Sequence, residues 1–404
     1  MATSGNFVQL HNHTHYSLLD GASKIPDLVK RAKELNMPAV GITDHGNMHG
    51  AYEMWSTAVK EGVKPIIGIE AYVTPETARQ DQTRVSWDTN WNPDIDPQHR
   101  RRNPNDVSGG GLITHLTMWA ETDEGLVNLM KASTDANLEG RVMRHPRMDK
   151  EILAKYSKGI IASSGCPSGI IQTRLLLGQF DEALRAAGEL QDIFGRDNFY
   201  IEFMDHGLKI EKQVTDGLLD IAKKLNAPLL ATNDSHYVRA EDAGSQDAML
   251  CINSGSTLDE PGRFKFDGTG YYLKSAEEMR ELFKDIPEAC DNTLEIAERC
   301  NVMFDDHEDG AFMPQFDCPE GWDETSLFLK KVEEGLERRY DGHPPIEVLK
   351  QADYECGVIC QMQFCGYFLV VADYINWAKS HGVMVGPGRG SAAGAMVAYA
   401  MGIT

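Results

Sequence analysis

Short apolar runs rich in β-branched residues alternate with amphipathic stretches from the start of the chain to about residue 240. The apolar runs, which have the length of buried strands, are residues 7–10, 39–43, 65–73, 112–119, 159–163, 199–204 and 228–232. The stretches with helical spacing are residues 25–35, 48–61, 125–136, 170–194 and 210–225. This alternation predicts an α/β fold with a parallel sheet, either doubly wound or closed as a barrel.

Residues 76–111 interrupt the alternation, because they are polar and show no apolar period. We expect a long exposed loop there. It contains a D-x-D pair, Asp94 and Asp96, and a basic cluster at residues 100–102. Since no strand or helix would hold these side chains in place, we interpret them as solvated charges rather than as a metal or phosphate site.

The pattern changes to a mostly helical one from about residue 275. The expected elements are helices at 275–283, 292–300, 326–338 and 347–362, an apolar strand at 367–371, and a helix through residue 378. We therefore predict one domain in residues 1–275 and a second in 276–404, which ends without a closing element, so we expect a fragment. Cys356, Cys360 and Cys365 lack the spacing of a zinc knuckle and are expected to pack in a core.

Composition narrows the class of protein. The 404 residues include 39 Lys and Arg against 61 Asp and Glu, a formal charge of −22, which argues against a passive DNA-coating protein. An enzyme that meets phosphate through bound cations is not excluded. The chain shows no basic-then-apolar leader and no long apolar run, and its eight cysteines do not resemble a disulfide framework. We expect a cytoplasmic protein without a membrane partner.

Side chains that bind metals follow or occupy every predicted strand. They are His11, His13, Asp20, His45, Glu70, His115, Cys166, Asp234 and His236, with Asp44 next to a ligand and His206 after the sixth strand. The carboxyl ends of strands are where α/β proteins place their active sites. Because a closed barrel brings its first and last strands together, convergence of these donors favours a barrel of about seven strands.

Nine donors exceed the needs of one cation and suit two or three. Imidazoles with one thiolate favour Zn, Mn or Fe over Mg or Ca. Such centres hydrolyse phosphoesters. Asp44 would orient a ligand, and His206 is considered as a contact for substrate phosphate.

The segments LHNHTHYSLLDGASKI, VGITDHGNMHG, GIEAYV, SSGC and TNDSHY resemble, in order, the polymerase-and-histidinol-phosphatase (PHP) domain. More narrowly, the chain resembles the PHP domain that opens the alpha subunits of bacterial DNA polymerase III, the C-family replicative polymerases, over about residues 5–275. The resemblance implies a distorted seven-stranded barrel with a trinuclear metal centre held by all nine donors. It also implies a 3′→5′ exonuclease that removes misincorporated nucleotides from DNA, with His13, Asp44, Asp234 and His236 as candidate catalytic residues.

VGPGRGSAAG resembles the start of that family's palm domain. The resemblance implies that Arg389, Gly390 and Ser391 hold the triphosphate of the incoming deoxynucleotide, although Ala395 stands where the family usually has serine. Residues 391–404 contain no Asp or Glu, so no carboxylate is present to hold the palm's Mg. We expect the parent protein to be a DNA-directed DNA polymerase acting on a primer-template, with sliding clamp and replisome contacts elsewhere, and this fragment alone not to polymerise.

Three alternatives remain. The same metal centre could hydrolyse a small phosphomonoester, or the cations could merely brace a structural domain. An amidohydrolase barrel also begins with H-x-H, but no Lys stands at a strand end to bridge two metals.

Overall fold

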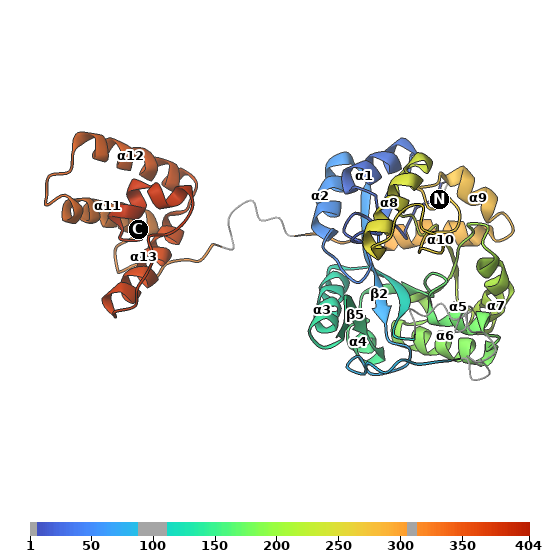
Figure 1. Ribbon diagram of the computed structural model, residues 1–404. Coiled ribbons are helices and arrows are strands. Elements are labelled where there is room, and N and C mark those ends of the chain that lie inside the picture. Colours follow the sequence, from blue (N-terminus) through green and yellow to red (C-terminus); the bar gives the residue numbers. More distant parts are fainter. Residues whose placement is uncertain (1–5, 88–110, 305–312) are drawn as a thin grey trace. The chain divides into compact units, whose positions relative to one another are not determined.

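The chain folds into two compact units, residues 1–304 and 305–404, in a computed structural model that describes residues 6–87, 111–304 and 313–404 (Figure 1). The second unit starts later than the expected residue 276, because the intervening helices belong to the first unit. Cys290 and Ile296 of these helices, and Cys300 just after them, are buried in its core. The D-x-D pair at 94–96 and the basic cluster at 100–102 lie outside the described residues.

Helices surround a central set of strands in the first unit (Figure 1). The helices are α1 (Ile25–Glu34), α2 (Ala51–Glu61), α3 (Asp123–Glu139), α4 (Lys150–Lys155), α5 (Ile170–Leu176), α6 (Phe180–Phe194), α7 (Lys209–Leu225), α8 (Ala243–Ser254), α9 (Ala276–Leu282) and α10 (Pro287–Arg299). The strands are β1 (Ala39–Ile42), β2 (Lys64–Val73), β3 (Thr114–Ala120), β4 (Arg141–Val142), β5 (His145–Met148), β6 (Ile160–Ser163), β7 (Phe199–Phe203) and β8 (Leu229–Ala231). The α/β class is confirmed.

The sheet is mixed rather than wholly parallel. β2 pairs in parallel with β1 and with β5, and β6, β7 and β8 form a second parallel run. Between these runs lies β3, which is antiparallel to both β2 and β6. The expected parallel order therefore fails at β3, where the strand enters from the opposite end.

Backbone hydrogen bonds close the strands into a barrel. Residues 7–10 do not form a regular strand, but Gly41 N donates to Gln9 O at 2.8 Å and His13 N donates to Ser235 O at 2.7 Å. Segment 9–13 thus lies between β1 and the chain that follows β8. The ring of segment 9–13, β1, β2, β3, β6, β7 and β8 confirms the closed barrel of the resemblance.

Several local elements differ from the sequence prediction. The helix expected over 170–194 is broken at residues 177–179 into α5 and α6, and the hairpin of β4 and β5 had no pattern to reveal it. The described start of the 76–111 loop is not simply exposed, because Trp87 is buried. The Arg174 guanidinium lies 4.2 Å from the centre of its ring.

The second unit is helical over its described residues, with α11 (Glu324–Arg339), α12 (Ile346–Gln361), α13 (Cys365–Ser380) and α14 (Met396–Ala400). The strand expected at 367–371 is wrong, since these residues lie within α13. Its buried residues Cys365, Leu369 and Ala372 recur at helical spacing, and Cys365 packs with Cys356 in the apolar core. Among the described helices none could cross a membrane singly, although α12 and α13 reach that length and hydropathy together across a 114° bend.

Candidate metal centre

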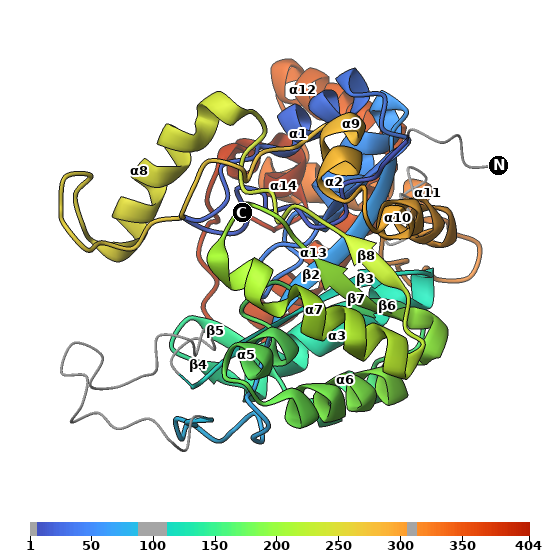
Figure 2. The ribbon, with the colours of Figure 1, turned by 90° about the vertical axis from the view of Figure 1, so that its right-hand side faces the viewer.

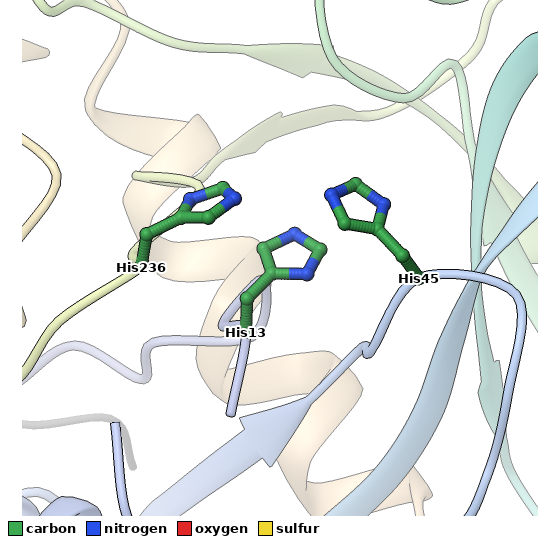
Figure 3. Close-up of side chains that lie close together, drawn as sticks. All are labelled: His13, His45 and His236. Atoms are coloured by element: carbon green, nitrogen blue, oxygen red, sulfur yellow. The ribbon is translucent and has the colours of Figure 1, made fainter. Parts of the chain in front are cut away.

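The structure brings all nine predicted donors together at one mouth of the barrel. They come from segment 9–13 and the turn after it, from β2 and β3, and from the chain just beyond β1, β6 and β8. Figure 3 shows the rings of His13, His45 and His236, which reach one another from three separate segments.

His11 and His13 point to the same side, as alternate residues of an extended segment do. Their ring centres are 5.3 Å apart. Both Nε2 atoms approach Glu70 Oε2, at 3.4 and 3.1 Å, and Asp234 Oδ1, at 3.4 and 2.9 Å. The first and last parts of the barrel therefore share two carboxylates.

His115 reaches the same place from an unexpected end of its strand. It is the second residue of β3 and pairs with Tyr72 near the end of β2, because the two strands are antiparallel. Its Nδ1 atom lies 2.9 Å from Glu70 Oε1 and 3.4 Å from Cys166 Sγ. His115 thus lies in the cluster, although the sequence argument assumed a parallel strand.

Asp20 and His45 complete the cluster. Asp20 Oδ2 lies 2.9 Å from His45 Nε2 and 3.7 Å from His236 Nε2, and His45 Nδ1 lies 3.0 Å from Glu70 Oε2. Each carboxylate thus stands between imidazoles of different segments.

Seven buried atoms of the cluster lack a hydrogen-bond partner, although several lie close together. They are His11 Nε2, His13 Nε2, Asp20 Oδ1, His45 Nδ1, Glu70 Oε2, Asp234 Oδ1 and His236 Nε2. Unpaired buried polar atoms are costly, so such a concentration needs a compensating ligand. Atoms that converge without hydrogen-bond geometry fit a group of cations.

Three of the imidazoles are turned so that Nε2 faces the cluster. His11 Nδ1 lies 2.8 Å from Glu202 Oε1, His13 Nδ1 lies 3.0 Å from Ser17 Oγ, and His236 Nδ1 donates to its neighbouring Asp234 carbonyl at 2.8 Å. Contacts at Nδ1 select the tautomer that leaves Nε2 free to bind a metal.

The carboxylates and imidazoles of the cluster shift one another's pKa values. Burial raises the pKa of the Glu70 carboxyl, but three neighbouring imidazoles, led by His115, outweigh burial and hold that pKa well below its usual range. Burial lowers the pKa of His11, yet surrounding carboxylates, led by Glu202, raise it well above its usual value. Burial, then Glu70, raises the pKa of the Cys166 thiol. Protons on histidines thus supply charge that divalent cations would supply, and Cys166 would lose its proton to a cation.

Three overlapping sets of donors are close enough to hold one cation each. They are His11 with His13, Glu70 and Asp234; His13 with His45 and His236; and His45 with Glu70 and His115. One nitrogen atom binds one cation, and the three sets share His13 and His45. The sets therefore cannot each bind a cation independently of the others. The two oxygens of Glu70 face different rings and can bridge, so the residues fit two or three adjacent divalent cations.

Glu202 is a residue that the sequence reasoning missed. It is buried on β7 and accepts hydrogen bonds from Thr232 Oγ1 at 2.5 Å and from Ser163 Oγ, besides contacting His11. Its only signal in the sequence is an acidic residue inside an apolar run.

Asp44 acts on the cluster through the adjoining turn. It accepts hydrogen bonds from Thr14 N at 2.7 Å and from Ser17 Oγ at 2.6 Å, and Ser17 contacts the His13 ring. In the described contacts, Asp44 therefore reaches the donor cluster through Ser17, as expected of a residue that orients a ligand.

His206 does not serve the role considered for it. Its Nδ1 lies 2.6 Å from Glu211 Oε1, its Nε2 lies 2.9 Å from Asn233 O, and its ring stacks on Tyr271 at 4.1 Å. With both nitrogens engaged, the ring holds the chain before Asp234 and is not available to a substrate phosphate.

Asp234 adopts a left-handed backbone conformation, with φ of +43°. Few side chains tolerate this region, and Asp is one of them. The turn places the carboxylate and the His236 ring on the same side.

A cleft of about 320 Å³ gives access to the cluster and opens onto Asp20 and His45. Its walls are the turn at 16–20, residues 46–49, Tyr72, the hairpin of β4 and β5, and one side chain each from α3 and α8. The donors can therefore be reached from outside through this cleft.

The glycine loop of the second unit is exposed. Gly388 and Gly390 have φ of +89° and +87°, which explains why glycine stands there. Arg389 and Ser391 flank Gly390, and residues 383–385 are not a strand.

Two family profiles match the chain. The PHP domain profile matches residues 9–206, and the profile described as the bacterial DNA polymerase III alpha NTPase domain matches residues 326–404. The chain is 51% identical over 404 residues to DNA polymerase III subunit alpha of Mycobacterium tuberculosis, and 40% identical over 402 residues to that of Treponema pallidum. The alignments cover 100% and 99% of this chain but 33% and 32% of those proteins. The chain therefore spans about a third of the length of the curated relatives it matches.

Among solved structures, a two-domain protein of Bacteroides vulgatus containing a predicted PHP-like metal-dependent phosphoesterase aligns at 13% identity and a TM-score of 0.31. That alignment covers 73% of this chain and 69% of the other. From the two profiles and the identity along its whole length, the chain carries a PHP domain and is similar throughout to the corresponding third of bacterial DNA polymerase III alpha subunits.

Proposed function

We propose that the first unit is a metal-dependent phosphodiesterase that acts as a 3′→5′ exonuclease on DNA and removes misincorporated nucleotides. The observation that carries this proposal is the convergence of nine donors with seven unpaired buried atoms at the base of an open cleft. The imidazole-rich set with one thiol supports Zn, Mn or Fe as the cations.

When bound, such cations stabilise negative charge that develops on the phosphate and activate water for attack. The chain's own residues prepare the site. Glu202 and Ser17 fix the rings of His11 and His13, and Glu70 spans the donor sets. Asp20 and His45 line the cleft, so a substrate phosphate would meet the centre from their side.

For the whole protein we propose a DNA-directed DNA polymerase, on the strength of the similarity along this chain. Arg389, Gly390 and Ser391 would hold the triphosphate of a deoxynucleotide, with Mg bound by palm carboxylates outside these 404 residues. DNA primer-template, the sliding clamp and other replisome subunits are the proposed partners.

The test compares the 404-residue chain with its Asp234→Asn variant on a 3′-mismatched primer in Mn or Zn. We expect the variant to lose primer-end degradation while its circular dichroism spectrum stays unchanged. Asp216→Asn, on the exposed face of α7, is the matched control and should keep wild-type activity. Wild-type activity in Asp234→Asn would remove this site from the mechanism.

Two other outcomes would replace the proposal. Faster hydrolysis of a soluble phosphomonoester than of the DNA end would identify a small-molecule phosphatase. No hydrolysis with any divalent metal, together with a melting temperature that falls on chelation, would identify cations that only brace the fold.

A further inference from the structure

We infer that the cleft above the metal centre binds the phosphate backbone of the DNA strand whose end is cut, and that Arg141 and Arg144 hold this strand. The inference rests on the proposed function and adds the residues that select a polynucleotide over a small phosphoester. The two arginines and the cleft are together called the strand clamp below.

The position of the two arginines supports this role. They lie on the hairpin of β4 and β5, and both line the cavity that opens onto Asp20 and His45. Figure 2 shows this hairpin and α8 on the same side of the unit, and a hydrogen bond between Arg144 and Asn253 joins them. A strand lying in the cleft would pass the arginines before it reaches the donors.

Both guanidinium groups are without an acidic partner in the described part of the chain. Arg141 donates to Met143 O at 3.4 Å, and Arg144 donates to the side-chain oxygen of Asn253. Arg79 of the same unit, by contrast, pairs with the carboxylate of Asp149. In a chain with a formal charge of −22, two guanidinium groups that no described carboxylate neutralises, at the mouth of this cleft, can bind phosphate.

The hairpin is held firmly at its base. Arg147 is buried and donates to the carbonyls of Gly140 at 3.2 Å, Leu112 at 3.2 Å and Asp81 at 2.8 Å. The arginines are therefore presented from a fixed support rather than from a loose loop.

Arg144 is also fixed relative to the metal donors. Asn253, which accepts its hydrogen bond, donates to Leu19 O at 3.3 Å, one residue before Asp20. This chain of contacts sets the distance between guanidinium and donor cluster before any substrate arrives.

The remaining walls of the cleft suit an anion. Asp20 is the one carboxylate among the described lining residues, and it is a donor to the cations. Asn47 and Asn137 line the cleft as neutral residues, and Asn47 is fixed by its bond to Tyr16 O at 3.0 Å. With cations in place, the cleft offers positive charge along its length.

The strand clamp acts differently on long and short substrates. A substrate with a single phosphate can occupy only the metal centre, whereas a strand places further phosphates beside the arginines. Removing the arginines should therefore weaken the binding of a strand and leave the hydrolysis of a small diester unchanged.

The test is the double variant Arg141→Ala/Arg144→Ala in the 404-residue chain. Its matched control is Arg196→Ala/Lys223→Ala, which removes two exposed cations that line a separate cavity with Tyr200. We expect the KM for a single-stranded oligonucleotide to rise by about tenfold or more, with kcat within about threefold of wild type. For bis(p-nitrophenyl) phosphate, neither KM nor kcat should change.

A second measurement does not depend on turnover. Fluorescence anisotropy with a labelled oligothymidylate of about twelve nucleotides, in EDTA and low salt, measures the dissociation constant. This constant should be at least about tenfold higher for the double variant than for the wild type. The plot of the logarithm of the binding constant against the logarithm of the salt concentration should become shallower. Its slope should fall by roughly one for each phosphate that the variant no longer holds. Unchanged binding in this variant, or an equal loss in the control pair, would overturn the strand clamp.

The two proposals fail in distinguishable ways. If the wild-type chain hydrolyses no phosphoester, the proposed function falls while the EDTA binding experiment still decides the strand clamp. If hydrolysis is intact and equal in both double variants, the strand clamp falls alone.

Discussion

Glu202 Oε1 lies 2.8 Å from Nδ1 of His11, and both side chains are fully buried inside the barrel. The contact joins β7 to segment 9–13 and turns Nε2 of His11 towards the other donors. Because Thr232 and Ser163 also donate to this carboxylate, its position is fixed before any cation binds.

We predict that Glu202→Gln weakens metal binding without unfolding the barrel. The amide keeps the shape of the side chain but loses the charge that orients and polarises His11, a change that typically costs about 10–100-fold in affinity. Titration calorimetry with Zn or Mn measures the loss, and Asp216→Asn is the control. Equal affinity in Glu202→Gln and the wild type would show that this contact does not tune the centre.

Stability should depend on pH through His145. Burial, and then the charge of Arg144, lower the pKa of His145 to about 4 in the folded protein, against about 6.5 in an unfolded chain. Between these values the unfolded chain binds more protons, so this histidine removes stability as the pH falls from about 6.5 towards 4 and has little effect above.

The variant that tests this dependence is His145→Phe. It keeps an aromatic ring against Tyr72, whose ring centre lies 4.6 Å from that of His145. Urea unfolding of both proteins at about pH 7, 5.5 and 4.5 gives the free energies. The difference should move in favour of the variant as the pH falls. A difference that stays constant with pH would contradict the assignment.

A pair of glycine substitutions tests the packing of helices on the barrel. A Cβ at Gly125, in the first turn of α3, would lie 1.7 Å from the carbonyl oxygen of Gly159. Neither backbone can yield easily, so Gly125→Ala should destabilise the unit by about 1–3 kcal/mol or more. Gly188→Ala in α6, where the nearest atom is 3.9 Å away, should instead stabilise by roughly 0.5–1 kcal/mol. Thermal unfolding of both variants measures the contrast, and equal melting temperatures would refute it.

Truncation should distinguish the two possible domain boundaries. Residues 1–304 retain α10 and the Cys300 that follows it; Ile296 and Cys300 are buried beside Trp119 and Leu230, so this fragment should unfold cooperatively. Residues 1–275 would expose that surface to water and should aggregate or lose cooperativity. Near-ultraviolet circular dichroism during heating separates these outcomes, and a stable 1–275 fragment would favour the boundary expected from the sequence pattern.

Much of the donor cluster could be predicted from the sequence, because ligand residue types recur where strands end. The H-x-H at His11 and His13 fixes two rings on one side without any tertiary information. Glu202 could not be found in this way, since a single carboxylate inside an apolar run has no periodic signal. His206 carried the expected residue type at the expected place, but its ring nitrogens are satisfied by Glu211 and Asn233.

The errors in the fold have a physical cause as well. Residues 367–371 are apolar and too short for periodicity to separate a strand from a helix, and only the packing of Leu369 and Ala372 decides the matter. The direction of β3 likewise cannot be predicted from the sequence, because an apolar run has the same pattern in a parallel and in an antiparallel strand. Only the register of His115 against Tyr72 reveals it.

The reversal of β3 also has a consequence for how this protein can vary. Val73 pairs with Thr114, so the connection between β2 and β3 leaves and returns on a single side of the barrel. A connection between parallel strands has to travel back along the barrel, which imposes a minimum length. This connection escapes that requirement, so insertions or deletions within it need not disturb the spacing of Glu70 and His115. The chain can therefore change in length between β2 and β3 while Glu70 and His115 keep their places in the donor cluster.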